Sequence, residues 1–377
     1  MKKLLILTNR PLHRAPRIIR EIEALKNDYK ITILGATPPP FEFVEFVKID
    51  MISIFERALH KLYKIINAGK LWEGIFYSVN KQLAGMFQKY KPDIIITHEP
   101  EFLPYLHRYK DKYNYKVVFN SHEYNPLQFE TIKNWANTYG RFYFNLYKKY
   151  LKKLDLLINV CDGIAMKCKD EFGKDSIVIP NACTYYPDIV PLILNDQENP
   201  IRMIHHGGAM RERRTEYMIE AVRKLGSSFQ LDIMLVSGDQ EYLDELKLLA
   251  ANFDNVNILP PIDFYDIVPF LAKYDIGLYN MPANGFNQIN SLPNKLFEFI
   301  QARLCIVISN SPEMKKVVEQ NNLGLVSKGF SSEELYDCLK NIDRHQINNF
   351  KANADKVAER LSAEKYYQYY LDTVKSL

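Results

Sequence analysis

Two series of short apolar runs, separated by helical patterns, constrain the fold of this chain more than any other feature. Most runs are bounded by turn-forming residues, and several are apolar throughout. Continuous apolar strands that alternate with helices are typical of a parallel sheet with both faces covered. We therefore predict an α/β protein with two Rossmann-like, doubly wound domains. The first series begins at residues 4, 31, 93, 116, 155 and 176, and the second at residues 202, 231, 255, 275, 305 and 323.

The length of 377 residues agrees with two domains, since a domain commonly holds about 100 to 200 residues. Residues 181–200 contain three prolines and a polar cluster, which predicts an irregular linker. The tail from Ser362 has a capping residue and a helical apolar pattern. We place the domains at 1–185 and 186–361, and expect the helix at 362–377 to pack back on the first domain.

Composition excludes several classes of protein. The net charge of +4 argues against a nucleic-acid-binding protein, and no run reaches the roughly 18 apolar residues of a membrane span. The five cysteines are widely spaced without a CxxC pair, so we expect a reducing, cytoplasmic setting and neither a disulfide framework nor a zinc site. Basic amphipathic segments at 141–153 and 55–70 predict core helices with solvated lysines, or alternatively peripheral contact with the inner face of a membrane.

The first candidate site follows the run at residue 202, in "HHGGAMRERRTEYMIEAV". Ligands of open α/β sheets bind at the carboxyl ends of the strands, so the expected site is a cleft between the two domains. Gly207 and Gly208 let the backbone approach a ligand, and three arginines precede a helix. Glycines, guanidinium groups and a helix N-terminus together suit a diphosphate. The alternative is that the three arginines are solvated side chains at the start of the helix and bind no ligand.

The second candidate is the helix in "SLPNKLFEFIQARLCIVISN". Its leucines and isoleucines recur at helical spacing and are expected in the core, with Ser291 or Asn290 as the cap. Asn294 and Glu298 are four residues apart and therefore stack on one face, with Lys295 beside them. A carboxylate there could accept both ribose hydroxyls, while the lysine faces phosphate. A Lys295–Glu298 surface pair is the alternative.

These two segments resemble the signature of the GT-B glycosyltransferases of family 4, and "VVFNSHEYNP" and "DGIAMKCKDEFG" are similar to segments of that family's first domain. The resemblance spans most of the chain in the expected order. It implies an acceptor-binding first domain and a nucleotide-sugar-binding second domain that face each other across a cleft. It also implies that Glu298 binds the donor ribose, that Arg213 and Lys295 contact the diphosphate, and that His122 lies near the transferred sugar.

The chain departs from the family pattern at two positions. Asn290 stands where the family usually has an acid, eight residues before the ribose-binding glutamate, and this residue is the expected donor-sugar contact. Gly208 stands where the family has the first of two basic phosphate residues, a role that Arg211 or Arg214 could take over.

Residues of the first domain supply the expected acceptor side. His122 and His98 each follow a predicted strand, with Glu99 and Glu123 next to them. The resemblance implies that His122 orients the sugar and acceptor, because the leaving diphosphate helps to take the acceptor proton. The alternative for each histidine is a structural role at the end of a strand, with its hydrogen bonds made within the protein.

The loop after the first strand offers cations toward the same cleft, which suit a phosphate-bearing acceptor. An equal alternative is that these cations lie at the start of a helix and bind no ligand. The cationic residues of this loop are Arg10, His13, Arg14 and Arg17.

The sequence also lacks the motifs of other enzyme classes. No Asp-x-Asp pair, GxGxxG, GxxxxGK[ST] or GxSxG occurs, so we expect no metal and no other cofactor. We predict a retaining glycosyltransferase of the hexosyltransferase type. It would use a nucleotide-sugar donor, UDP-linked by expectation, and a glycan or polyprenyl-diphosphate-linked acceptor, in surface polysaccharide biosynthesis. A GT-B sugar-nucleotide 2-epimerase and a non-catalytic GT-B partner subunit are the alternatives.

Overall fold

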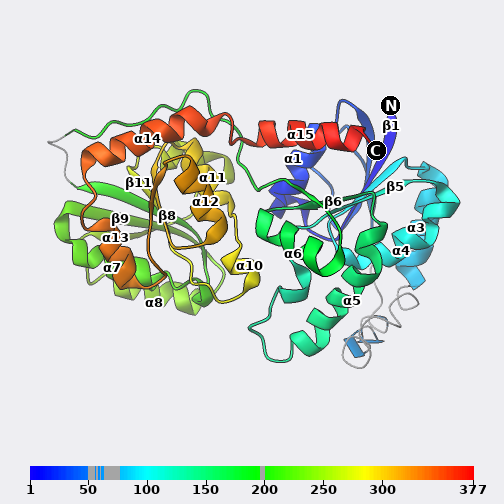
Figure 1. Ribbon diagram of the computed structural model, residues 1–377, viewed down its shortest axis with the longest axis horizontal. Helices are drawn as coiled ribbons and strands as arrows, with labels where there is room; N and C mark the ends of the chain where they lie inside the picture. The colour runs from blue at the N-terminus through cyan, green and yellow to red at the C-terminus, as the bar shows by residue number, and fades with distance from the viewer. Residues whose placement is uncertain (50–55, 57, 60, 63–76, 196–199) are drawn as a thin grey trace. The chain divides into compact units, whose positions relative to one another are not determined.

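A computed structural model describes residues 1–49, 77–195 and 200–377, together with residues 56, 58, 59, 61 and 62. The chain divides into two compact units, drawn in Figure 1. Unit 1 consists of Met1–Pro180, Gly285–Asn287 and Tyr367–Leu377, and unit 2 of Asn181–Asn284 and Gln288–Tyr366. The predicted basic segment at 55–70 lies mostly outside the described residues.

The sheet of unit 1 has the strand order β3-β2-β1-β4-β5-β6-β7, and every neighbouring pair is parallel. The apolar runs predicted from the sequence form six of these strands, because side chains that are buried on both faces must be apolar throughout. The strands are β1 (Lys2–Thr8), β2 (Tyr29–Gly35), β3 (Glu45–Lys48), β4 (Ile94–Thr97), β5 (Lys116–Asn120), β6 (Leu156–Asn159) and β7 (Ile177–Val178).

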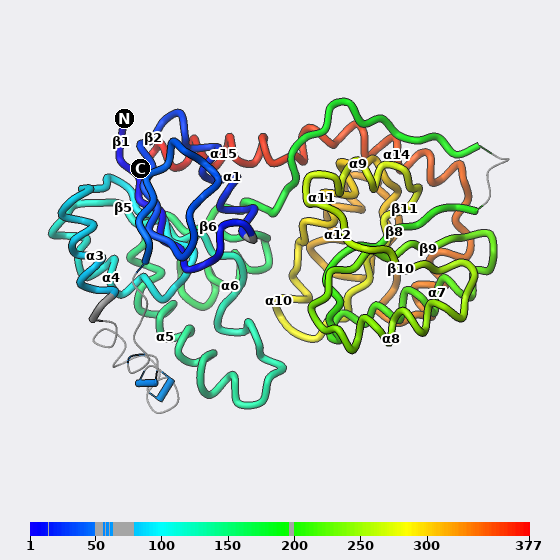
Figure 2. The backbone as a smooth tube through the Cα atoms, turned by 180° about the vertical axis from the view of Figure 1, so that it is seen from behind, coloured from blue at the N-terminus to red at the C-terminus, as the bar shows by residue number. Residues whose placement is uncertain are grey.

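The helices of unit 1 come from both ends of the chain. The views in Figures 1 and 2 place α15 alongside α1, where Tyr367 Oη donates a 3.0 Å hydrogen bond to the Arg17 carbonyl. The C-terminal residues therefore belong to the first unit. The helices are α1 (Pro16–Leu25), α3 (Tyr77–Tyr90), α4 (Leu103–Tyr113), α5 (Arg141–Tyr150), α6 (Asp162–Phe172) and, from Tyr367 onward, α15 (Ala363–Lys375).

Helix α5 shows how the basic segment at 141–153 is used. Most of its aromatic side chains and its leucine are buried, among them Phe142, Leu146 and Tyr150, whereas Phe144, Lys148 and Lys149 are exposed. This distribution is that of a core helix with solvated lysines. Among the residues described, no helix is long and apolar enough to cross a membrane.

The sheet of unit 2 has the order β10-β9-β8-β11-β12-β13 and is also parallel. All six strands correspond to runs of the second series. They are β8 (Ile201–Ala209), β9 (Phe229–Ser237), β10 (Val256–Leu259), β11 (Ile276–Tyr279), β12 (Cys305–Ile308) and β13 (Gly324–Val326).

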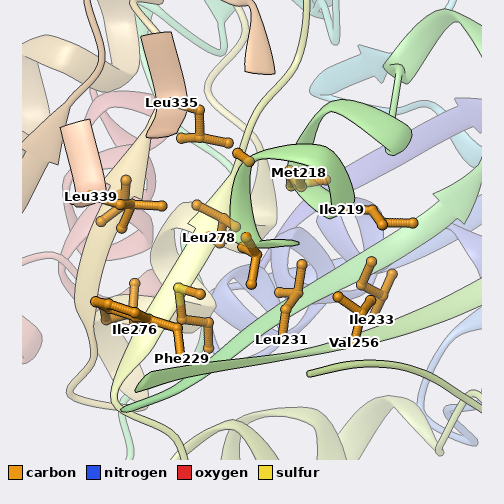
Figure 3. Packing of buried hydrophobic residues seen from close by; sticks show 14 of the residues in the cluster. Met218, Ile219, Phe229, Leu231, Ile233, Val256, Ile276, Leu278, Leu335 and Leu339 are labelled. Carbon is orange, nitrogen blue, oxygen red and sulfur yellow. The ribbon is translucent and has the colours of Figure 1, made fainter. Parts of the chain in front are cut away.

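The core of unit 2 lies between its sheet and the covering helices. Figure 3 shows Met218 and Ile219 of α7 and Leu335 and Leu339 of α13 packed over side chains of β9 and β11 such as Leu278. The helices are α7 (Glu216–Leu225), α8 (Gln240–Ala250), α9 (Ile267–Leu271), α11 (Asn294–Gln301), α12 (Pro312–Gln320), α13 (Ser332–Leu339) and α14 (Arg344–Ala358), and α10 (Phe286–Ile289) begins in the segment assigned to unit 1.

The predicted linker has neither helix nor strand at residues 181–195, which confirms the expectation for that part. Buried Arg303 holds it in place, since its Nη2 donates a 2.9 Å hydrogen bond to the Tyr186 carbonyl while its Nε pairs with Asp355 at 2.7 Å.

Candidate functional site

In unit 2, a lysine and an arginine converge on the glycine pair at the end of β8. A Cβ added to Gly207 would lie 3.1 Å from Lys295 Nζ and 3.2 Å from Arg213 Nη1, and Arg213 Nη1 donates a 3.4 Å hydrogen bond to the Gly208 carbonyl. Gly207 has a φ of +156°, which a residue with a side chain rarely adopts. The predicted Gly207, Gly208, Arg213 and Lys295 are therefore neighbours in space.

In the part of the chain that the structure describes, the two cations have no carboxylate partner. Within the described residues neither Lys295 nor Arg213 forms an ion pair, and Lys295 Nζ instead lies 5.6 Å from the centroid of the Tyr279 ring. Burial and the nearby Arg213 charge lower the pKa of Lys295 to about 8, although Glu298 opposes the shift. Two unneutralised cations side by side repel each other, so a bound anion would be stabilised by both.

The N-terminus of α11 lies next to this pair. The helix begins at Asn294 with Pro293 as its N-cap residue and has no side-chain cap, so the predicted capping by Ser291 or Asn290 is wrong. Uncapped N–H groups at a helix N-terminus favour an anion.

Glu298 is 4% exposed and faces β8 from the second turn of α11. Its Oε2 lies 3.2 Å from His206 Nε2, and this contact replaces the Lys295–Glu298 surface pair that was the alternative. Burial lowers the pKa of His206 although Glu298 opposes the shift, so the imidazole is neutral near pH 7. Sequence reasoning missed His206, whose signal was its position directly before the two glycines.

The other two arginines of this loop are used differently. Arg211 makes two 2.7 Å hydrogen bonds to the carboxylate of Glu245, and Arg214 pairs with Glu216 at 3.3 Å. Both side chains are exposed and already neutralised, which argues against either as a substitute phosphate ligand. Asn290 lies in the turn that precedes α11 and is partly exposed.

In unit 1, the predicted histidines follow the neighbouring parallel strands β4 and β5. His98 Nδ1 and His122 Nε2 are 3.0 Å apart, and the rings meet edge to face with centroids 5.2 Å apart. Burial, followed by the electrostatic influence of the neighbouring His98, Arg10 and Arg17, holds the pKa of His122 well below its usual range. His98 is 2% exposed and His122 is partly exposed.

The histidines continue into a carboxylate that sequence reasoning missed. His98 Nε2 lies 2.8 Å from Glu21 Oε2, and the other carboxylate oxygen accepts hydrogen bonds from Asn120 Nδ2 at 2.8 Å and from Tyr370 Oη at 2.6 Å. Burial raises the pKa of Glu21, but His98 and the hydrogen bonds outweigh this effect and lower it. Nothing in the sequence distinguishes Glu21 from a solvated helix glutamate.

A second buried carboxyl group lies directly after His98. Glu99 Oε1 accepts a 3.1 Å hydrogen bond from the Thr8 hydroxyl and lies 3.4 Å from Arg10 Nε, while Oε2 is buried with no partner among the described residues. Burial raises the pKa of Glu99 to about 7, although His98 and Arg10 oppose the shift. Burial also raises the pKa of Glu123, which accepts a 3.0 Å hydrogen bond from Gln128.

The basic loop after β1 supplies fewer free cations than expected. Arg17 is 3% exposed, and its guanidinium donates to Asn120 Oδ1 and to the Ile179 carbonyl, so its expected role facing a ligand is wrong. Arg10 is partly exposed, and Arg14 ends a 3-10 turn, Leu12–Arg14. No group of three His, Cys, Asp or Glu residues in the described parts of the chain could hold a metal ion.

Two family models match the chain in succession. The model described as Glycosyltransferase Family 4 matches residues 17–183, and the one described as Glycosyl transferases group 1 matches residues 201–343. A search of curated proteins found no match.

Solved structures with the same fold span the whole chain. Anabaena Alr3699/HepE in complex with UDP is 15% identical with a TM-score of 0.73, and each chain is covered completely. Sucrose-phosphate synthase from Thermosynechococcus elongatus is 12% identical with a TM-score of 0.77, over 100% of this chain and 99% of the other. The E. coli trehalose-6-phosphate protein bound with UDP-2-fluoro glucose is 13% identical with a TM-score of 0.70 and the same coverage.

Two parallel, doubly wound units with these relatives define the GT-B fold, and the fold predicted from the sequence is confirmed. The family models make the chain, more particularly, a family 4-like glycosyltransferase.

Proposed function

We propose that the protein transfers a hexose from UDP to a glycan or lipid-linked acceptor, with retention at the anomeric carbon and without a metal. The observation that carries this proposal is the pair of unneutralised cations, Lys295 and Arg213, beside the Gly207 backbone and the uncapped start of α11. That arrangement matches the charge and shape of a diphosphate. Two of the proteins with this fold were solved with UDP or a UDP-sugar analogue.

Each part of the nucleotide-sugar donor has its own proposed ligands. Lys295, Arg213 and the first N–H groups of α11 hold the diphosphate, and Glu298 accepts the ribose hydroxyls. The carboxylate of Glu298 suits this role because His206 beside it is neutral and leaves its charge available. Asn294 and Asn290, both partly exposed near the start of the same helix, complete the donor side.

Transfer breaks the bond between the anomeric carbon and the diphosphate and forms one to the acceptor oxygen on the same face. The acceptor proton passes to the leaving diphosphate, whose negative charge Lys295 and Arg213 stabilise. His122 orients the sugar, and catalysis rests on positioning and on charge stabilisation rather than on an obligatory protein base.

The acceptor is assigned to unit 1. Arg10, Arg14 and Glu123 are its proposed contacts, and the buried His98 acts through His122. Arg10 lies 3.4 Å from Glu99, and the cations of this loop suit an acceptor that carries phosphate, such as a polyprenyl-diphosphate-linked glycan in surface polysaccharide assembly. A lipid-linked acceptor would bring the protein to an anionic membrane, and the exposed Arg141, Lys148 and Lys149 of α5 suit a peripheral contact with it.

Nucleotide binding provides the first test. UDP should raise the unfolding temperature more than GDP or ADP, because a ligand that binds only the folded state stabilises it. In calorimetry Arg213→Ala should weaken UDP binding at least about tenfold, whereas Arg214→Ala, which removes an already paired arginine, should not. Equal UDP affinity in both variants contradicts the diphosphate assignment.

Product analysis separates the alternatives. A transferase forms a glycosylated acceptor with retained configuration, an epimerase converts the donor without any acceptor, and a partner subunit binds UDP without turnover.

A further inference from the structure

Buried hydrogen bonds connect α1 to His122, and together they assign a role to its two ring nitrogens. This assignment rests on the proposed function only for the use that catalysis makes of His122. The chain of contacts runs from Arg17 through Asn120, Glu21 and His98 to His122. In each contact, the chemistry of the two groups decides which one donates the hydrogen bond.

The direction starts at an arginine, which can only donate hydrogen bonds. Arg17 donates to Asn120 Oδ1 from Nε at 3.0 Å and from Nη2 at 2.8 Å. Two donors on one amide oxygen fix the orientation of the Asn120 side chain. Its Nδ2 group therefore faces Glu21 Oε1 and donates to it.

The carboxylate of Glu21 decides which ring nitrogen of His98 carries the proton. Glu21 is ionised and can only accept, so His98 Nε2 must carry a hydrogen. The buried Arg17 already supplies a positive charge to balance Glu21, and the network is neutral when His98 carries only that one proton. The unprotonated His98 Nδ1 then accepts from His122 Nε2, 3.0 Å away.

We propose that Glu21, acting through His98, holds His122 in the tautomer with a proton on Nε2, so that His122 Nδ1 accepts a hydrogen bond from a substrate hydroxyl. His122 has no other hydrogen-bond partner among the described residues, and it is partly exposed. A neutral imidazole has one donor and one acceptor nitrogen, and the partner of one nitrogen decides the role of the other. Glu21 and His98 are thus positioning residues, and the site selects an O–H group over a carbonyl or carboxylate.

Glu21→Gln is a sharp test because it should invert the whole chain of bonds. Asn120 and Tyr370 both donate at Oε1, so the glutamine carbonyl oxygen must take that position and its NH2 group must face His98. His98 Nε2 then becomes an acceptor, His98 Nδ1 a donor, and His122 Nδ1 acquires the proton. The change is isosteric and leaves the packing intact.

Nuclear magnetic resonance of protein labelled with ¹⁵N-histidine reads these states without any substrate. The His122 signals are assigned by their loss in His122→Gln. In the wild type, Nε2 of His122 should show the shift of a protonated nitrogen and Nδ1 that of a bare one, and Glu21→Gln should exchange them. Tyr370→Phe removes one donor but keeps the carboxylate, and should leave the wild-type pattern.

A proton on His122 Nδ1 in the wild type overturns the proposal, and this spectrum needs no variant to fold. An unchanged His122 tautomer in folded Glu21→Gln also overturns it. Because both readings come from the free protein, they stand apart from any failure of the proposed activity.

Kinetics then test the role of the acceptor nitrogen. Glu21→Gln should lower kcat/KM for transfer about tenfold or more with unchanged UDP affinity. If slow hydrolysis of the donor falls equally, the hydroxyl belongs to the donor sugar, and if only transfer falls, it belongs to the acceptor. Unchanged kcat/KM in a variant with the exchanged tautomer overturns the role of Nδ1.

Discussion

Gly207 shows how a single missing side chain can make room for a ligand. A Cβ at this position would lie 2.6 Å from Lys295 Cε and 3.1 Å from Nζ, so it would displace the lysine from the place assigned to phosphate. The space around Gly208, the next residue, is less crowded, since an added Cβ would lie 3.6 Å from its nearest neighbour, Arg213 Nη1. The two glycines therefore offer a matched pair of substitutions.

We expect Gly207→Ala to lower UDP affinity at least tenfold, about 1.4 kcal/mol, because of both the displaced lysine and the unfavourable φ. Gly208→Ala should change it by less than about threefold. Isothermal titration calorimetry with UDP measures both, and comparable affinities for the two variants would refute the assignment of this loop to the diphosphate.

Lys295 should make UDP binding depend on pH. Burial and Arg213 lower its pKa to about 8, so the ammonium is charged below that pH and loses its proton above it. UDP affinity should therefore decline as the pH rises from 7 to 9, by up to about tenfold per unit above the pKa. Lys295→Met should bind UDP weakly and show a flat profile over this range. A wild-type profile that is equally flat would mean that Lys295 does not contact the diphosphate.

At the scale of elements, the strands were the most predictable part of the fold. Twelve of the strands coincide with apolar runs, because a strand that is buried on both faces is apolar at nearly every position. The edge strand Glu45–Lys48 was missed, since it is only partly buried and its pattern is short and charged. The helix at Asn294 was found, but its start was misjudged because no side chain caps it.

The candidate site was predictable only where residues follow strands or lie in the motifs of the two loops. Gly207, Arg213, Lys295 and the two histidines were found in this way. Glu21 was not, because its partners come from residues 98, 120 and 370, and no local pattern reveals contacts so distant in sequence. Arg17 was misjudged for the same reason, since its partners are at residues 120 and 179.

Helix α15 should stabilise unit 1 through Tyr370, which is fully buried and donates to Glu21. Tyr370→Phe removes that donor from a buried carboxylate, and we expect a loss of about 1–3 kcal/mol in the free energy of unfolding. Tyr369→Phe is the matched control, because this neighbouring ring is 52% exposed. Urea denaturation measures both, and equal stabilities would show that the Tyr370 hydroxyl contributes nothing to the fold.

The two units of the protein divide the proposed chemistry between them. The residues proposed to bind the diphosphate and the ribose all belong to unit 2, whereas His98 and His122 belong to unit 1. Binding of the free nucleotide and turnover should therefore be separable by mutation.

We expect His122→Ala to leave UDP affinity unchanged while it lowers transfer about 100-fold or more. Glu298→Ala should weaken UDP binding and transfer together, because it removes the proposed ribose contact. Calorimetry and a transfer assay on the same preparations provide the comparison. A loss of UDP affinity in His122→Ala would contradict the division between the units.

The contacts of Tyr367 and Tyr370 with α1 also bear on the order of folding during synthesis. Residues 367–377 leave the ribosome after all of unit 2, yet they supply hydrogen bonds to Arg17 and Glu21 near the start of the chain. Until then, Glu21 lacks one of its donors and the polar interior of unit 1 is incomplete. The nascent first unit therefore lacks these two hydrogen bonds while the second unit is translated, and the donors to Glu21 are complete only after Tyr370 has left the ribosome.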